Sequence, residues 1–245
     1  MLATIARRLF PNRNGKHGAD LPDSLRGLRR QAEQGHAAAQ VAWGQALLDG
    51  RTGGADPAGA RAWFAIAAGA GYPLGQVMYA RALERGWGGA VDLPAAYRLY
   101  RQAAEAGDDW ARYNLGNMLL RGRGCARDRP AAWRYFLAAA TSGHAKSMTL
   151  IGRFLEEGWD RPRDIAAAAA WYRRGAEGGD YRGQHNLASL LAEAGHLDEA
   201  LVWWRRALPE ATPDILRAME EALAQLPGES AAALRQDVER RLREV

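Results

Sequence analysis

A single motif recurs along this chain at a constant interval of 36 residues. Gly107 marks one copy, and the same step leads without any gap to a glycine in the other copies, at Gly35, Gly71, Gly143 and Gly179. Self-similarity at a period of about 20 to 50 residues predicts an array in which one small structural unit stacks on the next. Such an array has no single central core, because each unit contacts only its neighbours.

Two columns of the repeat indicate how its helices pack. Leu119 is matched by a leucine in the other copies, at Leu47, Leu83, Leu155 and Leu191. Gly116 is matched by another small residue, at Gly44, Ala80, Gly152 and Ala188. A small residue lets two helices approach closely, and the neighbouring leucine then fills the space beside the contact. We therefore expect the leucine column to lie in the core.

The copy that spans residues 108–143 predicts two helices joined by a short turn. Apolar residues within 111–119 follow the spacing of one helical face, and Gly122 then breaks the pattern. After Asp128, a second apolar series over 132–140 has the same spacing. We name these helices A and B. A pair of this size cannot bury both faces alone, so the sequence predicts an all-α fold, a right-handed α-solenoid of helix-turn-helix repeats.

The same residues resemble the Sel1-like repeat, a relative of the tetratricopeptide repeat. The resemblance rests on Ala followed after three residues by Leu-Gly, on Gly-x-Gly and Asp in the turn, and on Ala-x-x-Trp-Tyr-x-x-Ala-Ala-x-x-Gly in helix B. It is strong in residues 111–143 and 164–179 and extends over about residues 21–211. The family implies a scaffold or adaptor that binds other proteins, with helix A on the concave side of the superhelix.

The repeat boundaries divide the chain into three parts. Residues 1–20 are a basic segment and linker, residues 21–211 are the array, and residues 212–245 are two capping helices. The array opens on a half repeat that matches helix B alone, and five units then begin at His36, Tyr72, Asp108, His144 and Asp180. The fifth unit reaches its second helix four residues sooner than the others, which is typical of the ordinary tetratricopeptide form.

The first ten residues form a short basic amphipathic stretch. Leu2, Ile5 and Leu9 have helical spacing, and Arg7 and Arg8 interrupt the apolar run that a secretory signal needs. Two interpretations stay open for Met1 to Phe10: an anchor for an anionic membrane or docking segment, and a frayed terminus. We favour the frayed terminus, because ten residues bind a bilayer weakly. Membrane contact is therefore an alternative.

Charge and cysteine content indicate a bacterial, cytoplasmic protein. Only two of the 33 basic residues are lysines, Lys16 and Lys146, which is typical of a GC-rich bacterial genome. The net charge of +5 is small for 245 residues, so no nucleic acid is expected as a partner. The alternative function is a peripheral membrane- or nucleic-acid-associated protein that uses the basic first segment and the arginines. Cys125 is the single cysteine, which excludes an intramolecular disulfide and is compatible with a reducing compartment. A peripheral position at the inner membrane is the alternative location.

No catalytic, metal or cofactor motif stands out from the repeat. His185, Ser189 and Glu193 share one face of a helix, but serine then lies between histidine and the acid, so the order is wrong for a triad. No pair of His, Cys or carboxylate residues has metal spacing, and no phosphate-binding glycine loop is found. We therefore expect a non-enzymatic protein without a cofactor, and a hydrolase is the less favoured alternative.

The face of helix A that points away from its apolar stripe is the candidate binding surface. Asn114 and Asn186 match the family position whose asparagine binds the backbone of an extended peptide, whereas Ala42, Met78 and Leu150 do not. Arginines on the same face favour an acidic or extended segment of another protein. An ordinary solvated helix face is the alternative. The candidate partner-binding residues are Arg81, Trp110, Asn114, Asn117, Arg121, Arg153 and Asn186.

Two tryptophans occupy one repeat position, two units apart. Trp87 and Trp159 each follow a glycine in the turn between helices A and B. Each either packs the turn onto the neighbouring helices or forms an exposed contact. We favour packing, because tryptophan is usually well buried.

Overall fold

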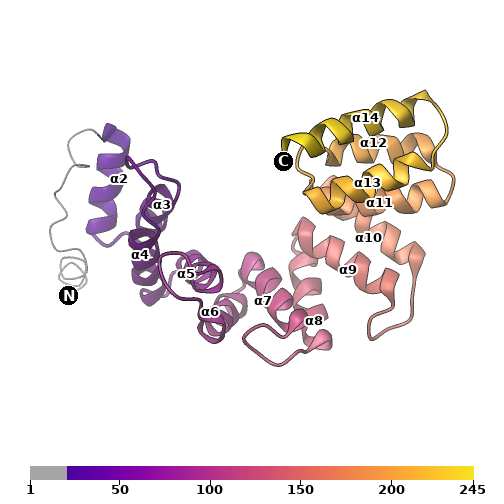
Figure 1. The fold of residues 1–245 in the computed structure, drawn as a ribbon. Helices are drawn as coiled ribbons and strands as arrows, with labels where there is room; N and C mark the ends of the chain where they lie inside the picture. Colours follow the sequence, from indigo (N-terminus) through magenta and orange to yellow (C-terminus); the bar gives the residue numbers. More distant parts are fainter. Residues whose placement is uncertain (1–20) are drawn as a thin grey trace. The chain divides into compact units, whose positions relative to one another are not determined.

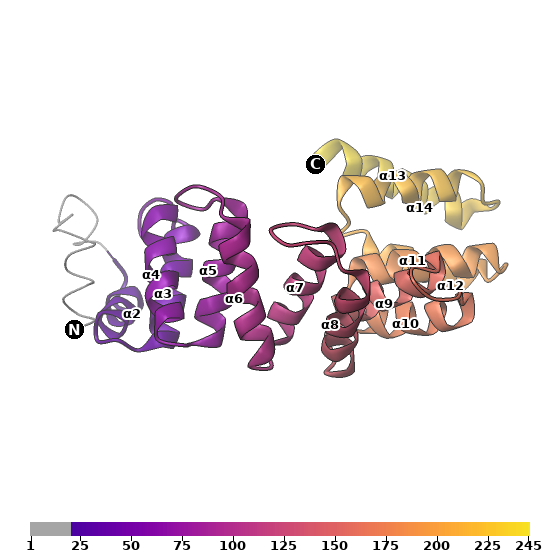
Figure 2. The same cartoon turned by 90° about the horizontal axis from the view of Figure 1, so that it is seen from below.

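The structure is a computed structural model that describes residues 21–245, and within this range it holds thirteen helices and no strand (Figures 1 and 2). The sequence prediction of an all-α repeat fold is confirmed. The predictions for residues 1–20 lie outside the described residues. The chain divides after Asp128 into two compact units, which are described separately.

The first unit holds the half repeat, two complete helix pairs and a further helix A. The half repeat forms α2 (Asp23–Glu33), which packs on α3. The rest of the unit consists of α3 (Ala37–Leu48), α4 (Pro57–Gly69), α5 (Pro73–Arg85), α6 (Leu93–Glu105) and α7 (Asp109–Arg121). Helices α3, α5 and α7 are helix A of their repeats, and α4 and α6 are helix B.

The second unit continues the alternation and ends in two additional helices. It consists of α8 (Arg129–Thr141), α9 (Ala145–Glu157), α10 (Ile165–Glu177), α11 (Tyr181–Glu193), α12 (Leu197–Ala207), α13 (Pro213–Ala224) and α14 (Glu229–Glu244). Helices α9 and α11 are helix A, and α8, α10 and α12 are helix B. Leu216, Met219, Leu234 and Val238 of the last two helices are buried in one cluster with Trp204 of α12.

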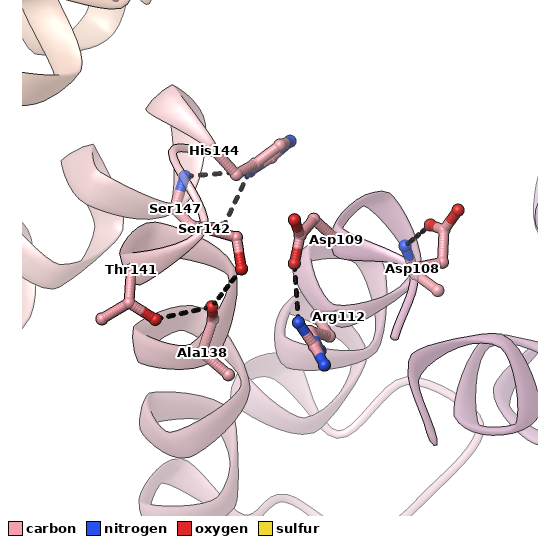
Figure 3. Close-up of polar contacts among 9 residues, drawn as sticks. Asp108, Asp109, Arg112, Ala138, Thr141, Ser142, His144 and Ser147 are labelled. Carbon is pink, nitrogen blue, oxygen red and sulfur yellow. Dashed lines mark hydrogen bonds and ion pairs between the residues drawn. The ribbon is translucent and has the colours of Figure 1, made fainter. Parts of the chain in front are cut away.

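Side chains at the helix starts cap several of the helices. Asp56, Asp92 and Asp164 each accept a hydrogen bond from the amide three residues later, at 2.9 Å, and so cap helix B. At helix A, Asp108 accepts from the amide of Ala111 at 2.7 Å. His144 does the same for α9 with Ser147 at 3.3 Å, and Figure 3 shows the contacts of both caps.

The column of small residues packs as its sequence predicts, and the leucine column does so in part. A Cβ atom at Gly44 would lie 2.6 Å from the ring of Phe64, and one at Gly152 would lie 2.6 Å from the ring of Tyr172. Helices A and B therefore touch at these glycines. Leu119 is buried, as is Leu83, whereas the other leucines of the column are partly buried and pack at the cluster edges.

None of the helices within residues 21–245 has the length and apolar character needed to cross a membrane.

Candidate protein-binding surface

The seven predicted binding residues lie on helix A in both units. Arg81 is on α5, Arg153 on α9 and Asn186 on α11, and the other four share α7. Trp110, at the start of α7, is half exposed at 50% and meets Tyr113 edge-on with ring centroids 6.1 Å apart. Asn114, Asn117 and Asn186 are partly buried, and Arg121 and Arg153 are exposed. Five of the seven therefore belong to the first unit and two to the second.

An arginine covers each of the two tryptophans in the turn after helix A. The guanidinium carbon of Arg81 lies 5.3 Å from the ring centroid of Trp87, and that of Arg153 lies 5.2 Å from Trp159. Trp159 also packs edge-on against Phe154 at 5.1 Å. The tryptophans are partly buried against their own unit, which agrees with the packing interpretation. Each one also holds an arginine by a cation–π contact.

A buried tyrosine of helix B donates a hydrogen bond to a glutamate of helix A in both units. The hydroxyl of Tyr100 lies 3.1 Å from the Glu84 carboxylate, and that of Tyr172 lies 2.6 Å from the Glu156 carboxylate. Burial, together with the adjacent carboxylate, raises the pKa of both tyrosines far above the ordinary value, so both hydroxyls stay protonated donors. Sequence reasoning missed this pair.

Two of the predicted asparagines already use part of their amide group. Asn186 hydrogen-bonds to the hydroxyl of Tyr172, which lowers the pKa of that tyrosine against the larger effect of burial. Asn117 donates from Nδ2 to the carbonyl oxygen of Tyr113 at 2.9 Å, within its own helix. An asparagine side chain has two N–H donors and one carbonyl acceptor, so both residues keep capacity for a further bond.

These contacts belong to one set of side chains that occurs twice. Arg81, Glu84, Trp87, Tyr100 and Asn114 recur after 72 residues as Arg153, Glu156, Trp159, Tyr172 and Asn186. We call these two sets the polar frames. The intervening repeat has different residues at all five positions, namely Asn117, Leu120, Arg123, Phe136 and Leu150. Comparing the sequence with itself at an offset of 72 residues, instead of 36, would have found the frames.

Each unit holds one complete polar frame. In the first unit, Arg123 adds an ion pair to Glu84, with Nη1 and Oε1 2.8 Å apart. The Glu84 side chain is only 17% exposed, so its carboxylate is held between this arginine and Tyr100. The equivalent of Arg123 in the second unit is Gly195, so Glu156 keeps its tyrosine but has no such arginine.

The residues that resemble a triad are held in structural roles. His185 is buried, and its Nδ1 accepts a hydrogen bond from the indole of Trp204 at 3.1 Å. Burial lowers the pKa of His185 to about 4, so the ring is neutral at physiological pH. The hydroxyl of Ser189 donates to the backbone carbonyl of His185 instead of to its ring. In the described part of the chain, no cluster of three potential ligands could hold a metal ion.

Comparison with protein-family models decides the family. The Sel1 repeat model matches residues 37–72, 73–108, 111–144 and 145–180, more than half of the chain. The chain belongs to the Sel1 repeat family. The half repeat and the fifth unit of the Sel1 array lie outside these four matches. A search of curated protein sequences found no match.

Solved Sel1 repeat structures share the fold. A Sel1 repeat protein from Oxalobacter formigenes is 22% identical, with a TM-score of 0.80 and 99% of each chain covered. The antigen c5321 of uropathogenic Escherichia coli is 22% identical, with a TM-score of 0.70 over 99% of this chain and 52% of its own. The immunity protein Pa5087 of Pseudomonas aeruginosa is 15% identical, with a TM-score of 0.54 over 93% of this chain and 84% of its own. At these identities the likeness shows the fold alone.

Proposed function

We propose that this protein is an adaptor that holds a partner protein through the face of helix A that points away from its apolar stripe, where it binds an acidic, extended segment. Sel1 repeat proteins generally serve as scaffolds for protein–protein interactions, and the fold is typically non-enzymatic. Family membership therefore supports the general role. The choice of surface and of partner chemistry rests on the polar frames.

The observation that carries the proposal is that each unit repeats the same polar frame. The intervening repeat packs Phe136 and Leu120 where the frames have tyrosine and glutamate, so packing alone does not require polar residues there. Placing a hydroxyl and a carboxylate in a buried position costs free energy unless they are paired. A frame that occurs in full in both units is therefore better explained by what it presents at the surface.

The groups that the frames present suit an extended acidic segment. Arg81 is held over Trp87, and a fixed guanidinium is a planar donor for a carboxylate. Asn114 is partly exposed on α7 and can both donate to and accept from a peptide backbone. Trp110 offers a half-exposed apolar ring on the same helix. Hydrogen bonds to the peptide backbone and pairing of arginine with carboxylates are two established modes of peptide recognition.

The test begins with proteins that co-purify with the chain from its native cell, followed by titration calorimetry on the candidate partner. Asn114→Ala should weaken binding by about fivefold at any salt concentration, the effect of about one lost hydrogen bond. Arg121→Ala should weaken it mainly at low salt, because exposed ion pairs are screened. Arg134→Ala, on helix B, is the control. If this control weakens binding more than the helix A variants do, the proposed surface is wrong.

We also propose a location in the bacterial cytoplasm, with the periphery of the inner membrane as the alternative. Its support is the arginine-rich composition and the single cysteine. Cell fractionation tests the location. Sedimentation with anionic lipid vesicles tests Met1 to Phe10 as an anchor, since such binding falls steeply with added salt.

A further inference from the structure

The two polar frames share their side chains but differ in the charges around them. The last turns of α5 and α7 end in Arg85 and Arg121, and the equivalent residues of α9 and α11 are Glu157 and Glu193. Helices α5 and α7 together carry four arginines and two carboxylates. Helices α9 and α11 carry three basic residues and three glutamates. The first unit therefore presents a net positive helix A surface, whereas that of the second unit is balanced.

Contacts within the first unit bring its arginines together. Arg81 and Arg85 both lie over the ring of Trp87, at 5.3 and 6.0 Å from its centroid. Arg123, in the turn after α7, reaches Glu84 of α5 at 2.8 Å, which places the end of α7 beside the end of α5. This ion pair also neutralises the only glutamate of the surface. Within residues 21–128, Arg81 and Arg85 contact the ring of Trp87, whereas the Glu84 carboxylate pairs with Arg123.

In the second unit, the basic residues of the equivalent positions are already balanced. Arg153 lies 3.9 Å from the Glu157 carboxylate, one helical turn away. Arg182 is close enough to Asp214 to lower the pKa of that carboxyl, after the larger effect of its hydrogen bond to Thr212. A carboxylate from a partner would have to compete with these acidic groups. The second frame is thus a poor site for an acidic group.

Helix stability does not account for the difference. Arginine in the last turn of α5 and α7 interacts favourably with the negative end of the helix dipole, so it has an ordinary structural explanation. Glutamate in the last turn of α9 and α11 opposes the same dipole. The exchange of arginine for glutamate therefore works against the stability of α9 and α11, and a difference in what the two surfaces bind explains it better.

We infer that the acidic part of the partner segment binds to the first unit alone, over Arg81, Arg85 and Arg121 of α5 and α7. The helix A surface of the second unit, with Arg153 paired to Glu157, does not bind this acidic part. This inference rests on the proposed function and narrows it, because it assigns the acidic specificity to one of the two frames.

The test exchanges charges between the two units, because each substituted position receives the residue that stands at the equivalent position of the other unit. The probe is a fluorescein-labelled synthetic peptide of alternating Glu and Ser residues, titrated with full-length protein at low salt and followed by fluorescence anisotropy. The double variant Arg85→Glu/Arg121→Glu should bind it about tenfold more weakly than the unaltered chain, since two attractions become repulsions. The double variant Glu157→Arg/Glu193→Arg should bind a second equivalent of peptide. Circular dichroism checks that both variants are folded.

A charge-matched control separates failure of this inference from failure of the proposed function. Arg98→Glu/Arg101→Glu makes the same change on α6, the helix B between α5 and α7. Unchanged binding by this control supports the inference. If it weakens binding as much as the α5 and α7 variant does, the helix A surface itself is wrong. If Arg153→Glu weakens binding as much as Arg81→Glu does, the assignment to the first unit is wrong. If the unaltered chain does not bind the peptide, the proposed acidic specificity itself is wrong.

Discussion

The pair formed by Tyr172 and Glu156 offers a sharp test of the second polar frame. We predict that Tyr172→Phe destabilises the folded chain by about 1.5–3 kcal/mol, the range for a hydrogen bond to an ionised group. The ring is fully buried, and its hydroxyl lies 2.6 Å from the Glu156 carboxylate. Phenylalanine keeps the packing of the ring but leaves the partly buried carboxylate without this donor. Asn186 also loses its tyrosine partner.

The first unit provides a matched comparison for this substitution. Tyr100 is equally buried and donates to Glu84 at 3.1 Å, but Glu84 also has an ion pair with Arg123 at 2.8 Å. After Tyr100→Phe the carboxylate therefore keeps a charged partner. We expect a smaller loss of about 0.5–1.5 kcal/mol, the net contribution of an ordinary hydrogen bond.

The intervening repeat indicates how the loss can be reversed. Leu120 and Phe136 stand there at the positions of the glutamate and the tyrosine. The double variant Glu156→Leu/Tyr172→Phe should therefore be more stable than Tyr172→Phe alone, because it no longer contains a carboxylate that has lost its tyrosine donor. Residues in direct contact couple by about 0.5–3 kcal/mol, and we expect this pair to lie in that range.

Equilibrium urea unfolding, followed by circular dichroism, measures all of these variants and the single variant Glu156→Leu. Two results would refute the reasoning. One is additive losses for the two substitutions at positions 156 and 172, which would mean that the hydroxyl and the carboxylate do not stabilise each other. The other is a loss for Tyr100→Phe as large as that for Tyr172→Phe, which would mean that Arg123 does not support its glutamate.

Three further predictions concern the core. Leu119→Ala should cost about 2–5 kcal/mol in urea unfolding, and a loss below about 0.5 kcal/mol would exclude the leucine column from the core. Gly152→Ala should cost about 1–3 kcal/mol, because its Cβ atom would lie 2.6 Å from an aromatic ring, whereas Gly69→Ala, which meets open space, should not destabilise. Burial lowers the pKa of His185 from 6.5 to about 4, so between these pH values only the unfolded chain takes up this proton. The contribution of His185 to the free energy of unfolding is therefore fully present above pH 6.5, and about 3 kcal/mol of it is lost as the pH falls toward 4. Unfolding at several pH values should show a smaller fall for His185→Gln and the same fall for His196→Gln.

The fold could be predicted from the sequence because its signals are local. Gly107 and its counterparts mark each repeat, and the spacing of apolar residues within a repeat depends on neighbours three or four positions away. Helix starts such as Asp92 and Asp164 are equally local, since each caps an amide three residues later. No distant part of the chain is needed to recognise any of these features.

The polar frames could not be predicted in the same way, because their partners lie on different helices. Tyr172 and Glu156 are 16 positions apart with a turn between them, so their contact depends on how helices A and B pack. Arg123 and Glu84 are 39 residues apart and belong to different repeats. The sequence did place Arg81, Asn114 and Asn186 on helix A, but whether they bind a partner stays a prediction.

The recurrence of the polar frame after 72 residues has a consequence for how such a chain can change its length. Tyr172 of one repeat hydrogen-bonds Asn186 of the next, whereas Phe136 is followed at the same distance by Leu150. Loss of one repeat by recombination would pair a phenylalanine with an asparagine, or a tyrosine with a leucine, at this spacing. A partly buried polar group at the junction would then have no hydrogen-bond partner. Loss or gain of two repeats together would restore every junction. A pair of repeats is therefore the smallest piece that can be added or removed with its polar contacts kept, and a tandem duplication of such a pair would yield a longer chain with another complete frame.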